Sequence, residues 1–185
     1  MPELAIVPLG ESVRGRELVF RYETAFYYDP VLTEGPGGWA LTLERKPFPA
    51  PVTKQFTDTL LSSWLEEPQV FAAQTDGRNL GYLELSHERW NNRMRVANLW
   101  VAEGFRRRGI GAALMAQAER SARDAGARAL VLETQSCNDP AICFYRRQGS
   151  TLTGLDLTAY SQADVAGREV RLELARPVPY EKEAP

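Results

Sequence analysis

Residues 95–112 read RVANLWVAEGFRRRGIGA, and this stretch decides the fold. The run Arg93–Val101 predicts a strand, and apolar residues at helical spacing after Gly109 predict an amphipathic helix. The first turn of a helix has N–H groups without intrahelical acceptors and carries about half a positive charge. Three arginines and two glycines at this position therefore predict a cradle for a phosphate-bearing ligand. A solvated turn is the alternative, and the segment alone does not decide between the two.

Other kinds of phosphate or nucleic-acid site do not fit this stretch. Leu114 stands where the dinucleotide fingerprint needs its third glycine, and no Gly-Lys-Ser/Thr follows as in a Walker loop. The basic cluster is short and has no interleaved aromatic residues. The whole chain has 22 basic and 24 acidic residues, a net charge of −2. We therefore expect no nucleic-acid partner.

Composition and length point to one globular domain over residues 1–185, with 44% apolar residues for its core. Cys137 and Cys143 are too few for a disulfide framework, and free thiols are typical of a reducing, cytoplasmic setting. With His87 as the only histidine, no metal site is expected, and His87 itself is expected at the surface. The N-terminal sequence predicts no signal peptide, and no apolar stretch approaches the ~18 residues that span a membrane.

The remaining pattern predicts a mixed α/β order, with antiparallel hairpins before and after a strand–helix–strand–helix centre. Asp139 is expected to cap a helix that has Pro140 in its first turn. Loops are expected at Leu32–Gly38 and at the proline-rich Lys46–Pro51, and a loose tail at residues 176–185. Helices are expected at Glu17–Tyr28, Thr57–Glu66, Ile110–Gly126 and Asp139–Gly149, and strands at Leu4–Leu9, Trp39–Arg45, Gln69–Thr75, Leu80–His87, Arg93–Val101, Ala129–Gln135, Thr151–Thr158 and Glu169–Ala175.

Two motifs of the chain point to a known family. Arg106-x-x-Gly109-x-Gly111, after a strand that ends Leu99-Trp100-Val101, resembles the acetyl-CoA loop of the GNAT superfamily of N-acetyltransferases. Asn138-x-x-Ala141-x-x-Phe144-Tyr145-x-x-x-Gly149 resembles the segment that follows its fifth strand. The resemblance covers about residues 70–175, the expected CoA-binding core. It implies a mixed, mostly antiparallel sheet with parallel, splayed central strands four and five and flanking helices.

A narrower resemblance is to the streptothricin acetyltransferase branch of the family. It rests on LETQSCNDPAICFYRRQG at 132–149, GLDLTAY at 154–160 and Trp90-Asn91. Ser150 departs from the pattern, since the family usually has an aromatic residue there, and this puts local packing in doubt. The branch implies acetyl transfer from acetyl-CoA to a primary amine of a small cationic acceptor, a streptothricin-like antibiotic or a polyamine, and hence antibiotic resistance. A peptide N-terminus or lysine as acceptor, a CoA-binding module without catalysis, and a homodimer stay open.

The resemblance also implies the site residues. Tyr145 is the expected general acid, with core packing as the alternative, and Glu133 is the expected general base, with Glu84 as a second candidate. Glu23, Phe26, Tyr27, Tyr28, Asp29, Asp156 and Tyr160 are candidates for the acceptor side, since acidic and aromatic groups suit a cation. The residues expected to bind acetyl-CoA are Leu99, Trp100, Val101, Arg106, Arg107, Arg108, Gly109, Ile110, Gly111, Ala112, Asn138 and Tyr145.

Overall fold

The computed structural model describes residues 3–179, and their contacts divide the chain into two compact units. The first unit comprises residues 3–20, 57–132 and 175–179, and the second comprises residues 21–56 and 133–174. Both units are assembled from separate stretches of the chain, so that four strands run from one unit into the other. The expectation of a single domain stays a prediction.

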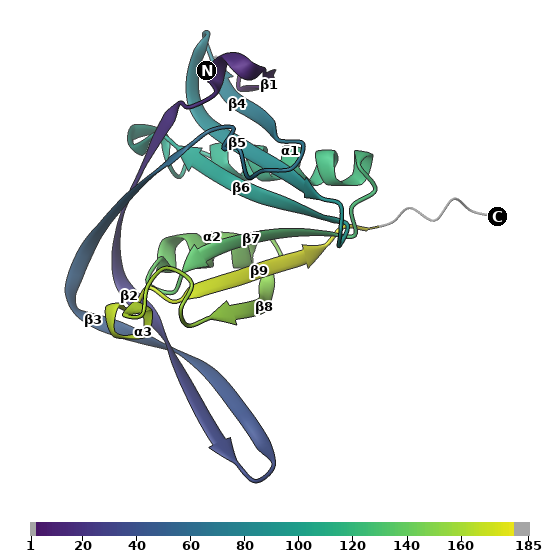
Figure 1. Cartoon of the computed structure of the whole chain (residues 1–185). Helices are drawn as coiled ribbons and strands as arrows, with labels where there is room; N and C mark the ends of the chain where they lie inside the picture. The colour runs from purple at the N-terminus through teal and green to yellow at the C-terminus, as the bar shows by residue number, and fades with distance from the viewer. Residues whose placement is uncertain (1–2, 180–185) are drawn as a thin grey trace. The chain divides into compact units, whose positions relative to one another are not determined.

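The first unit is a sheet with one long helix (Figure 1). Its strands follow the order β1-β4-β5-β6-β7, and neighbouring strands are antiparallel except for the parallel pair of β6 and β7. Helix α1 contacts β5 and β6. The elements are β1 (Ala5–Leu9), β4 (Gln69–Thr75), β5 (Arg78–Glu88), β6 (Arg93–Val101), α1 (Ile110–Asp124), the 3-10 turns η1 (Glu11–Val13) and η2 (Glu103–Phe105), and the first part of β7 (Ala129–Gln135).

The parallel pair of β6 and β7 corresponds to the family's fourth and fifth strands. Their register joins Arg93–Val96 to Ala129–Leu132 and includes none of the later residues of either strand. On its other side, β6 stays paired with β5 as far as Val101, with a register shift where Glu84 faces Asn98 and Leu85 faces Val96. The expected parallel central strands, which part toward their carboxyl ends, are confirmed.

The core of the first unit explains why α1 forms where the sequence predicts it. Leu114, Met115 and Ala118 recur at helical spacing and are fully buried, as are Leu83 and Leu85 of β5. Gly126 follows α1 with a φ of 66°, the left-handed conformation that ends helices and favours glycine. The sequence alone located this helix and strands β4 to β7 because their core faces carry regular apolar periods.

Gly81 of β5 lies at the closest approach between the sheet and α1. A Cβ there would stand 2.9 Å from the Trp100 carbonyl oxygen and 3.1 Å from Leu114 Cδ1. We expect Gly81→Ala to lower the unfolding free energy by about 1–3 kcal/mol, because neither backbone nor core can yield without strain. Urea unfolding measures this. Gly104→Ala, where a Cβ meets nothing within 4 Å, is the control and should change little; equal effects would contradict the packing argument.

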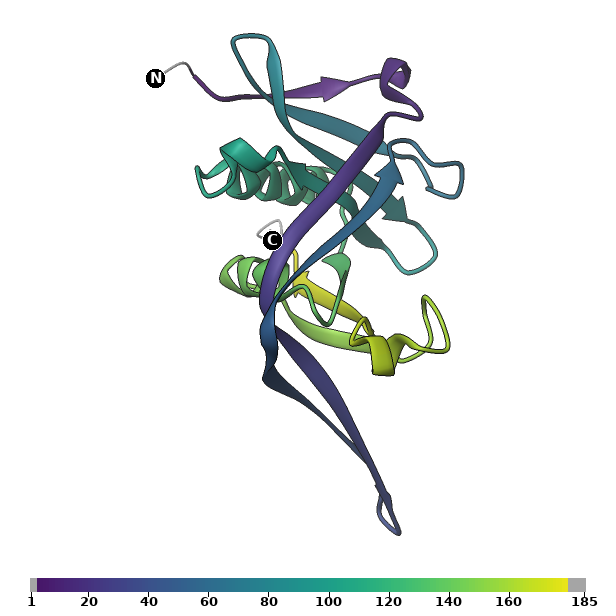
Figure 2. The ribbon, with the colours of Figure 1, turned by 90° about the vertical axis from the view of Figure 1, so that its left-hand side faces the viewer.

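The second unit joins a long hairpin to a small sheet and two helices (Figure 2). Strands β2 (Glu17–Gly35) and β3 (Gly38–Thr59) form a separate two-stranded sheet, of which residues 21–56 belong to this unit. The other strands follow the order β7-β9-β8. Besides the end of β7, the elements are α2 (Asp139–Arg147), β8 (Thr151–Asp156), α3 (Asp164–Gly167) and β9 (Arg171–Pro177).

The region of the hairpin is where the sequence-based expectations were wrong. Glu17–Tyr28 is strand and not helix, and Leu32–Gly38 and Lys46–Pro51 are strand except for the turn at residues 36–37. The three prolines of β3 stand at alternate positions, so the missing N–H groups all fall on one edge of the strand. A two-stranded sheet has such an edge without a partner, and an edge strand tolerates proline.

The expected helix at Thr57–Glu66 was also wrong. β3 continues to Thr59, and the chain then turns through Leu61, whose φ of 58° is incompatible with a right-handed helix. Leu60 and Leu61 are nevertheless buried in the first unit, which is the reason for their apolar character.

The ends of α2 and β9 differ in detail from expectation. Asn138, and not Asp139, caps α2: its side chain accepts a hydrogen bond from the Ala141 N–H at 3.2 Å. β9 extends to Pro177, and the Val178 N–H donates to the Arg128 carbonyl at 3.0 Å, so the first residues of the expected loose tail are ordered. Residues 180–185 lie outside the described residues.

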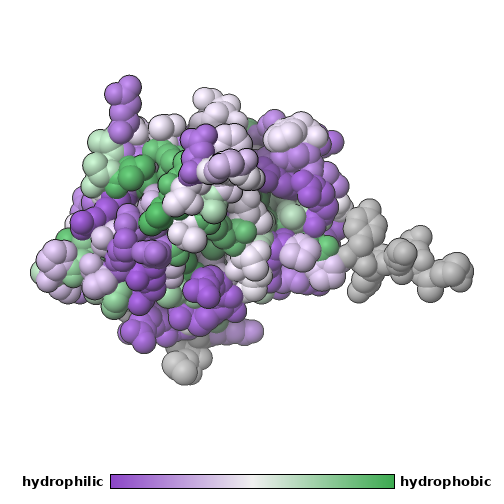
Figure 3. All heavy atoms as spheres, turned by 90° about the horizontal axis from the view of Figure 1, so that it is seen from below, coloured by the Kyte–Doolittle hydropathy of each residue, from purple (hydrophilic) through white to green (hydrophobic). Residues whose placement is uncertain are grey.

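The surface is mixed in character. Hydrophilic residues make up most of the face in Figure 3, with smaller groups of hydrophobic residues among them. None of the helices within residues 3–179 combines the length and the apolar character needed to cross a membrane.

Candidate active site

The loop between β6 and α1 presents backbone N–H groups at a helix N-terminus. Gly109 precedes α1 with a φ of 84°, and the first intrahelical bond runs from the Ala113 N–H to the Gly109 carbonyl at 3.0 Å. The N–H groups of residues 110–112 therefore lie before the first intrahelical bond. Gly109 has no side chain to cap this helix end, in contrast to Asn138 at the start of α2. A glycine without a capping side chain leaves the N–H groups open to an external anion.

The three arginines of the loop do different things. Arg106 is half-buried, and its Nε donates to the Val101 carbonyl at 3.1 Å, which ties the loop to the end of β6. Arg107 and Arg108 are exposed, and the Arg108 guanidinium lies 5.2 Å from the Phe105 ring centroid. Arg107 has a φ of 61°, so the backbone turns sharply just before Gly109. Two exposed cations beside a helix N-terminus suit a pyrophosphate.

The end of β6 is fixed through Trp100. Its indole N–H donates to the Val19 carbonyl at 2.8 Å, and its ring centroid lies 5.7 Å from that of Tyr82. Leu99, Trp100 and Val101 are half-buried. The sequence did not indicate the hydrogen bond to Val19, because a contact between residues this far apart has no local sequence pattern. It holds in place the strand end that is expected to bind the pantetheine arm.

In the second unit, α2 carries Tyr145 on its buried face. The side chain is 9% exposed, and burial raises the pKa of its phenol above the ordinary value. Among residues 3–179 the phenol oxygen has no hydrogen-bond partner, and the ring meets Phe144 edge to face at 5.2 Å. A phenol in this state is protonated at neutral pH and has its donor available. That property suits a general acid, whereas a purely structural tyrosine usually has its hydroxyl satisfied.

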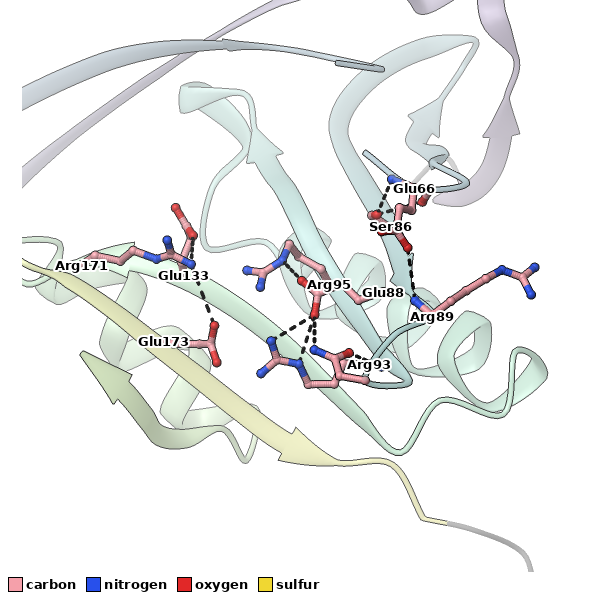
Figure 4. A network of polar contacts seen from close by, with 10 residues as sticks. Glu66, Ser86, Glu88, Arg89, Arg93, Arg95, Glu133, Arg171 and Glu173 are labelled. Carbon is pink, nitrogen blue, oxygen red and sulfur yellow. Dashed lines mark hydrogen bonds and ion pairs between the residues drawn. The ribbon is translucent and has the colours of Figure 1, made fainter. Parts of the chain in front are cut away.

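Glu133 lies on β7 with its carboxylate toward Arg171, as Figure 4 shows, and the residue is exposed. Its Oε2 is 2.8 Å from Arg171 Nη2 of β9, and Glu173 is 4.0 Å from the same guanidinium. The sequence predicted Glu133 as a base but did not indicate Arg171, since an arginine in an alternating strand gives no signal of its partner. The ion pair competes with a simple role as proton acceptor, so the base role stays a prediction.

Glu84, the second candidate base, is enclosed in the first unit. Its side chain is completely buried; Oε1 accepts the Leu61 N–H at 2.5 Å and Oε2 accepts Asn98 Nδ2 at 2.8 Å. Burial raises the pKa of this carboxyl, although both hydrogen bonds act in the opposite direction. Glu84 thus joins the strained turn at Leu61 to β6, and an acceptor amine does not reach it in this structure.

The raised pKa of Glu84 predicts how stability depends on pH. The folded state holds the proton more tightly than the unfolded state, so this group favours folding below its unfolded pKa, and the contribution is lost as pH rises through the folded pKa. Glu84→Gln should flatten that decline in urea unfolding measured between acidic and neutral pH. Glu84→Ala should cost about 1–3 kcal/mol for each buried partner left unsatisfied. The same pH slope in Glu84→Gln as in the unaltered chain would contradict this account.

The hairpin places the candidate residues for the acceptor side on two different faces of its strand. Because Glu23–Asp29 is strand, Phe26 and Tyr28 lie on one face and Tyr27 and Asp29 on the other. Tyr27 is buried below the Arg168 guanidinium at 4.3 Å, and Asp29 pairs with Lys46 at 2.6 Å. The strand therefore does not bring these side chains onto one face.

Tyr160 is the acceptor-side candidate that lies near Glu133. Burial raises the pKa of its phenol, and the charge of Glu133 raises it further. Asp164 holds the segment in place, because it accepts the Tyr160 N–H at 2.8 Å and the Ser161 hydroxyl at 2.7 Å. Asp156 accepts hydrogen bonds only from the adjacent Thr158, which is a local turn contact among the described residues.

The remaining residues singled out from the sequence make contacts that belong to the fold. His87 is half-buried, and its Nε2 lies 2.9 Å from Asn92 Oδ1. Both cysteines are free: Cys137 is buried 3.3 Å from the Tyr22 hydroxyl, and the Cys143 thiol lies 3.7 Å from Asp139. Ser150, at the departure from the family pattern, is buried and donates its N–H to the Tyr145 carbonyl at 3.0 Å. The small side chain therefore sits in an ordered turn.

Comparison with known proteins gives consistent matches. Residues 40–149 match the sequence model of the acetyltransferase (GNAT) family. A streptothricin acetyltransferase of Streptomyces lavendulae is 32% identical over 178 residues, which cover 92% of this chain and 90% of that protein. The crystal structure of nourseothricin acetyltransferase is 31% identical with a TM-score of 0.74, covering 95% of this chain and 99% of that one. A Bacillus anthracis protein solved with acetyl coenzyme A has the same fold, with a TM-score of 0.67 at 20% identity over 95% of this chain and 99% of that one.

Proposed function

Since this chain belongs to the acetyltransferase (GNAT) family, we propose that it acetylates a primary amine of a streptothricin-like antibiotic. Members of the family take the acetyl group from acetyl-CoA, and the chain is an acetyl-CoA-dependent acyltransferase. The observation that carries the proposal is the uncapped N-terminus of α1 behind Gly109, flanked by exposed Arg107 and Arg108. The antibiotic is supported by relatives whose names state that activity.

The residues of the first unit fit the CoA part of the donor. The N–H groups of residues 110–112 and the guanidiniums of Arg107 and Arg108 would hold the pyrophosphate, while Arg106 keeps the loop attached to β6. The backbone of Leu99–Val101 would bind the pantetheine arm as an added strand does. A backbone N–H near Trp100 or Val101 would stabilise the negative charge on the carbonyl oxygen as the amine attacks.

We assign the two proton transfers to residues of the second unit. Acetyl-CoA supplies a thioester carbonyl that a neutral amine can attack, and a free alkylamine is mostly protonated at neutral pH. Glu133 would take that proton, directly or through water, and Tyr145 would donate its phenolic proton to the leaving thiolate. Asn138 orders the start of α2 through its cap to Ala141 and thereby positions the helix that carries Tyr145.

The acceptor would be a small cation, since Glu133 and Tyr160 of the second unit offer a carboxylate and a phenol near each other. We propose the cytoplasm as the place of action, supported by the free thiols of Cys137 and Cys143. A homodimer belongs to the proposal as well.

The acceptor is tested by thiol release from acetyl-CoA in the presence of single amines. Streptothricin, spermidine and a peptide with N-terminal alanine are the three acceptors, with a reaction lacking acceptor as the background. We expect release above background with streptothricin, and a kcat/KM for the other two at least about 100-fold lower. If the peptide or spermidine reacted as well as streptothricin, that amine would be the acceptor in place of the antibiotic.

A further inference from the structure

Strand β6 contains an extra residue at the place where it leaves β7. Val96 and Asn98 face two consecutive residues of β5, so Ala97 between them forms a β-bulge. The register of β6 with β7 ends at the same point, at Val96. A bulge bends its strand and changes the direction of the residues that follow. The direction of residues 99–101 therefore depends on how β6 is held just after the bulge.

Beyond the bulge, cross-strand pairs on one face join β6 to β5. Asn98 lies opposite Glu84, and Trp100 lies opposite Tyr82 with 5.7 Å between the ring centroids. Asn98 Nδ2 donates to Glu84 Oε2 at 2.8 Å. Asn98 is 6% exposed and Glu84 is fully buried, so water does not compete for this hydrogen bond. Of these pairs, the polar one is nearer to the bulge.

Glu84 can fix Asn98 because its own carboxyl group is held from a second side. Its Oε1 accepts the N–H of Leu61, a buried residue in the left-handed conformation. One carboxyl group therefore joins the turn after β3 to the residue that follows the bulge. An aliphatic side chain would fill the same space but would leave the Leu61 N–H and Asn98 Nδ2 without this acceptor. The buried polar group is thus explained by the two segments that it connects.

We propose that Glu84 is a positioning residue for acetyl transfer, which acts through Asn98 on the direction of β6 after its bulge. This inference rests on the proposed function, in which a backbone N–H near Trp100 or Val101 stabilises the charge on the thioester oxygen. Such an N–H is effective only when it points at that oxygen, and a misplacement of about 1 Å can cost about 100-fold in rate. Glu84 touches neither substrate, because it is fully buried.

Asn98→Ala tests this role, because it removes the bond to β6 and keeps the bond between Leu61 and Glu84. We expect kcat with streptothricin to fall at least about 10-fold, while the Kd of acetyl-CoA changes less than about 3-fold, since the pyrophosphate loop is unaltered. Glu84→Gln should keep kcat within about 3-fold of the unaltered chain, because its amide can accept from Leu61 and donate to Asn98 once the Asn98 amide turns over.

Ser86→Ala is the matched control on the same face of the same strand. Ser86 is buried, and its Oγ accepts the Glu66 N–H at 3.1 Å and donates to the Glu66 carbonyl at 2.8 Å (Figure 4). It ties the loop after Leu61 to β5, but it stands opposite Arg95, where β6 still pairs with β7. We expect Ser86→Ala to lower the melting temperature as Asn98→Ala does and to leave kcat unchanged.

A second readout needs no acceptor. The infrared stretching frequency of the thioester carbonyl of bound acetyl-CoA, labelled with carbon-13, falls when an N–H donates to the carbonyl oxygen. We expect this shift in the unaltered chain and in Ser86→Ala, and we expect Asn98→Ala to lose at least about half of it. If streptothricin is not acetylated but the shift differs in this way, the acceptor is wrong and the role of Glu84 stands.

Several results would overturn the inference. Equal losses of kcat in Asn98→Ala and Ser86→Ala would mean that lower stability accounts for both. The role of Glu84 would also be excluded if Asn98→Ala kept the kcat and the carbonyl shift of the unaltered chain, or if Glu84→Gln lost as much activity as Asn98→Ala. An unaltered chain that does not bind acetyl-CoA would contradict the proposed function and this inference with it.

Discussion

Gly109→Asp is expected to weaken acetyl-CoA binding by about 100-fold or more, with the fold intact. Aspartate is a favoured N-cap and tolerates a positive φ better than most residues, so α1 should still form. Its carboxylate, however, would accept hydrogen bonds from the same N–H groups that are to bind the pyrophosphate, and it would repel the phosphates. Calorimetric titration of acetyl-CoA measures the loss.

Gly109→Asn separates charge from backbone strain. Asparagine has nearly the same shape, occupies the left-handed region readily and carries no charge. We expect it to bind acetyl-CoA more tightly than the aspartate variant, by about 10-fold or more, because only the charge differs. If Gly109→Asp bound acetyl-CoA as well as the unaltered chain, the N-terminus of α1 would not be the pyrophosphate site.

Tyr145→Phe is expected to lower kcat by about 100-fold or more and to leave acetyl-CoA affinity nearly unchanged. The phenol oxygen has no hydrogen-bond partner among residues 3–179, so its removal should change the unfolding free energy by less than about 1 kcal/mol. The ring itself, which packs against Phe144, is retained. Steady-state kinetics and a binding titration on the same preparation therefore separate chemistry from folding and from binding.

The leaving thiolate gives a second readout for this variant. An acceptor analogue whose reaction is limited by the attack of the amine should be slowed less than one limited by departure of the thiol. Equal kcat for Tyr145→Phe and the unaltered chain at every pH would remove Tyr145 from the mechanism and leave it as a core aromatic residue.

The sequence predicted the centre of the fold better than the N-terminal third. From Gln69 to Arg147 the apolar residues recur with the period of the element that they form, and glycines mark the helix ends at Gly126 and Gly149. Residues 17–59 include aromatic residues and prolines that fit a long two-stranded sheet but do not predict one. That sheet is a tertiary arrangement, which local periods do not reveal.

The candidate site shows the same division. The loop of Arg106–Ala112 and the start of α2 were predictable because each is a local motif with a backbone consequence, although the cap is Asn138 and not the expected Asp139. The pair of Glu133 with Arg171, the enclosure of Glu84 and the bond from Trp100 to Val19 join distant segments. Each changes what a residue can do, and none has a signature in the local sequence.

The most direct test of the account follows a labelled acetyl group from acetyl-CoA to streptothricin. The purified chain, acetyl-CoA labelled in its acetyl group and the antibiotic are mixed at neutral pH, and the label is located by mass spectrometry. The account predicts label on an amine nitrogen of the antibiotic, formed in step with free CoA and absent with Gly109→Asp at the same donor concentration. Tight binding of acetyl-CoA without transfer of label to streptothricin or any other amine would contradict it and leave a CoA-binding module.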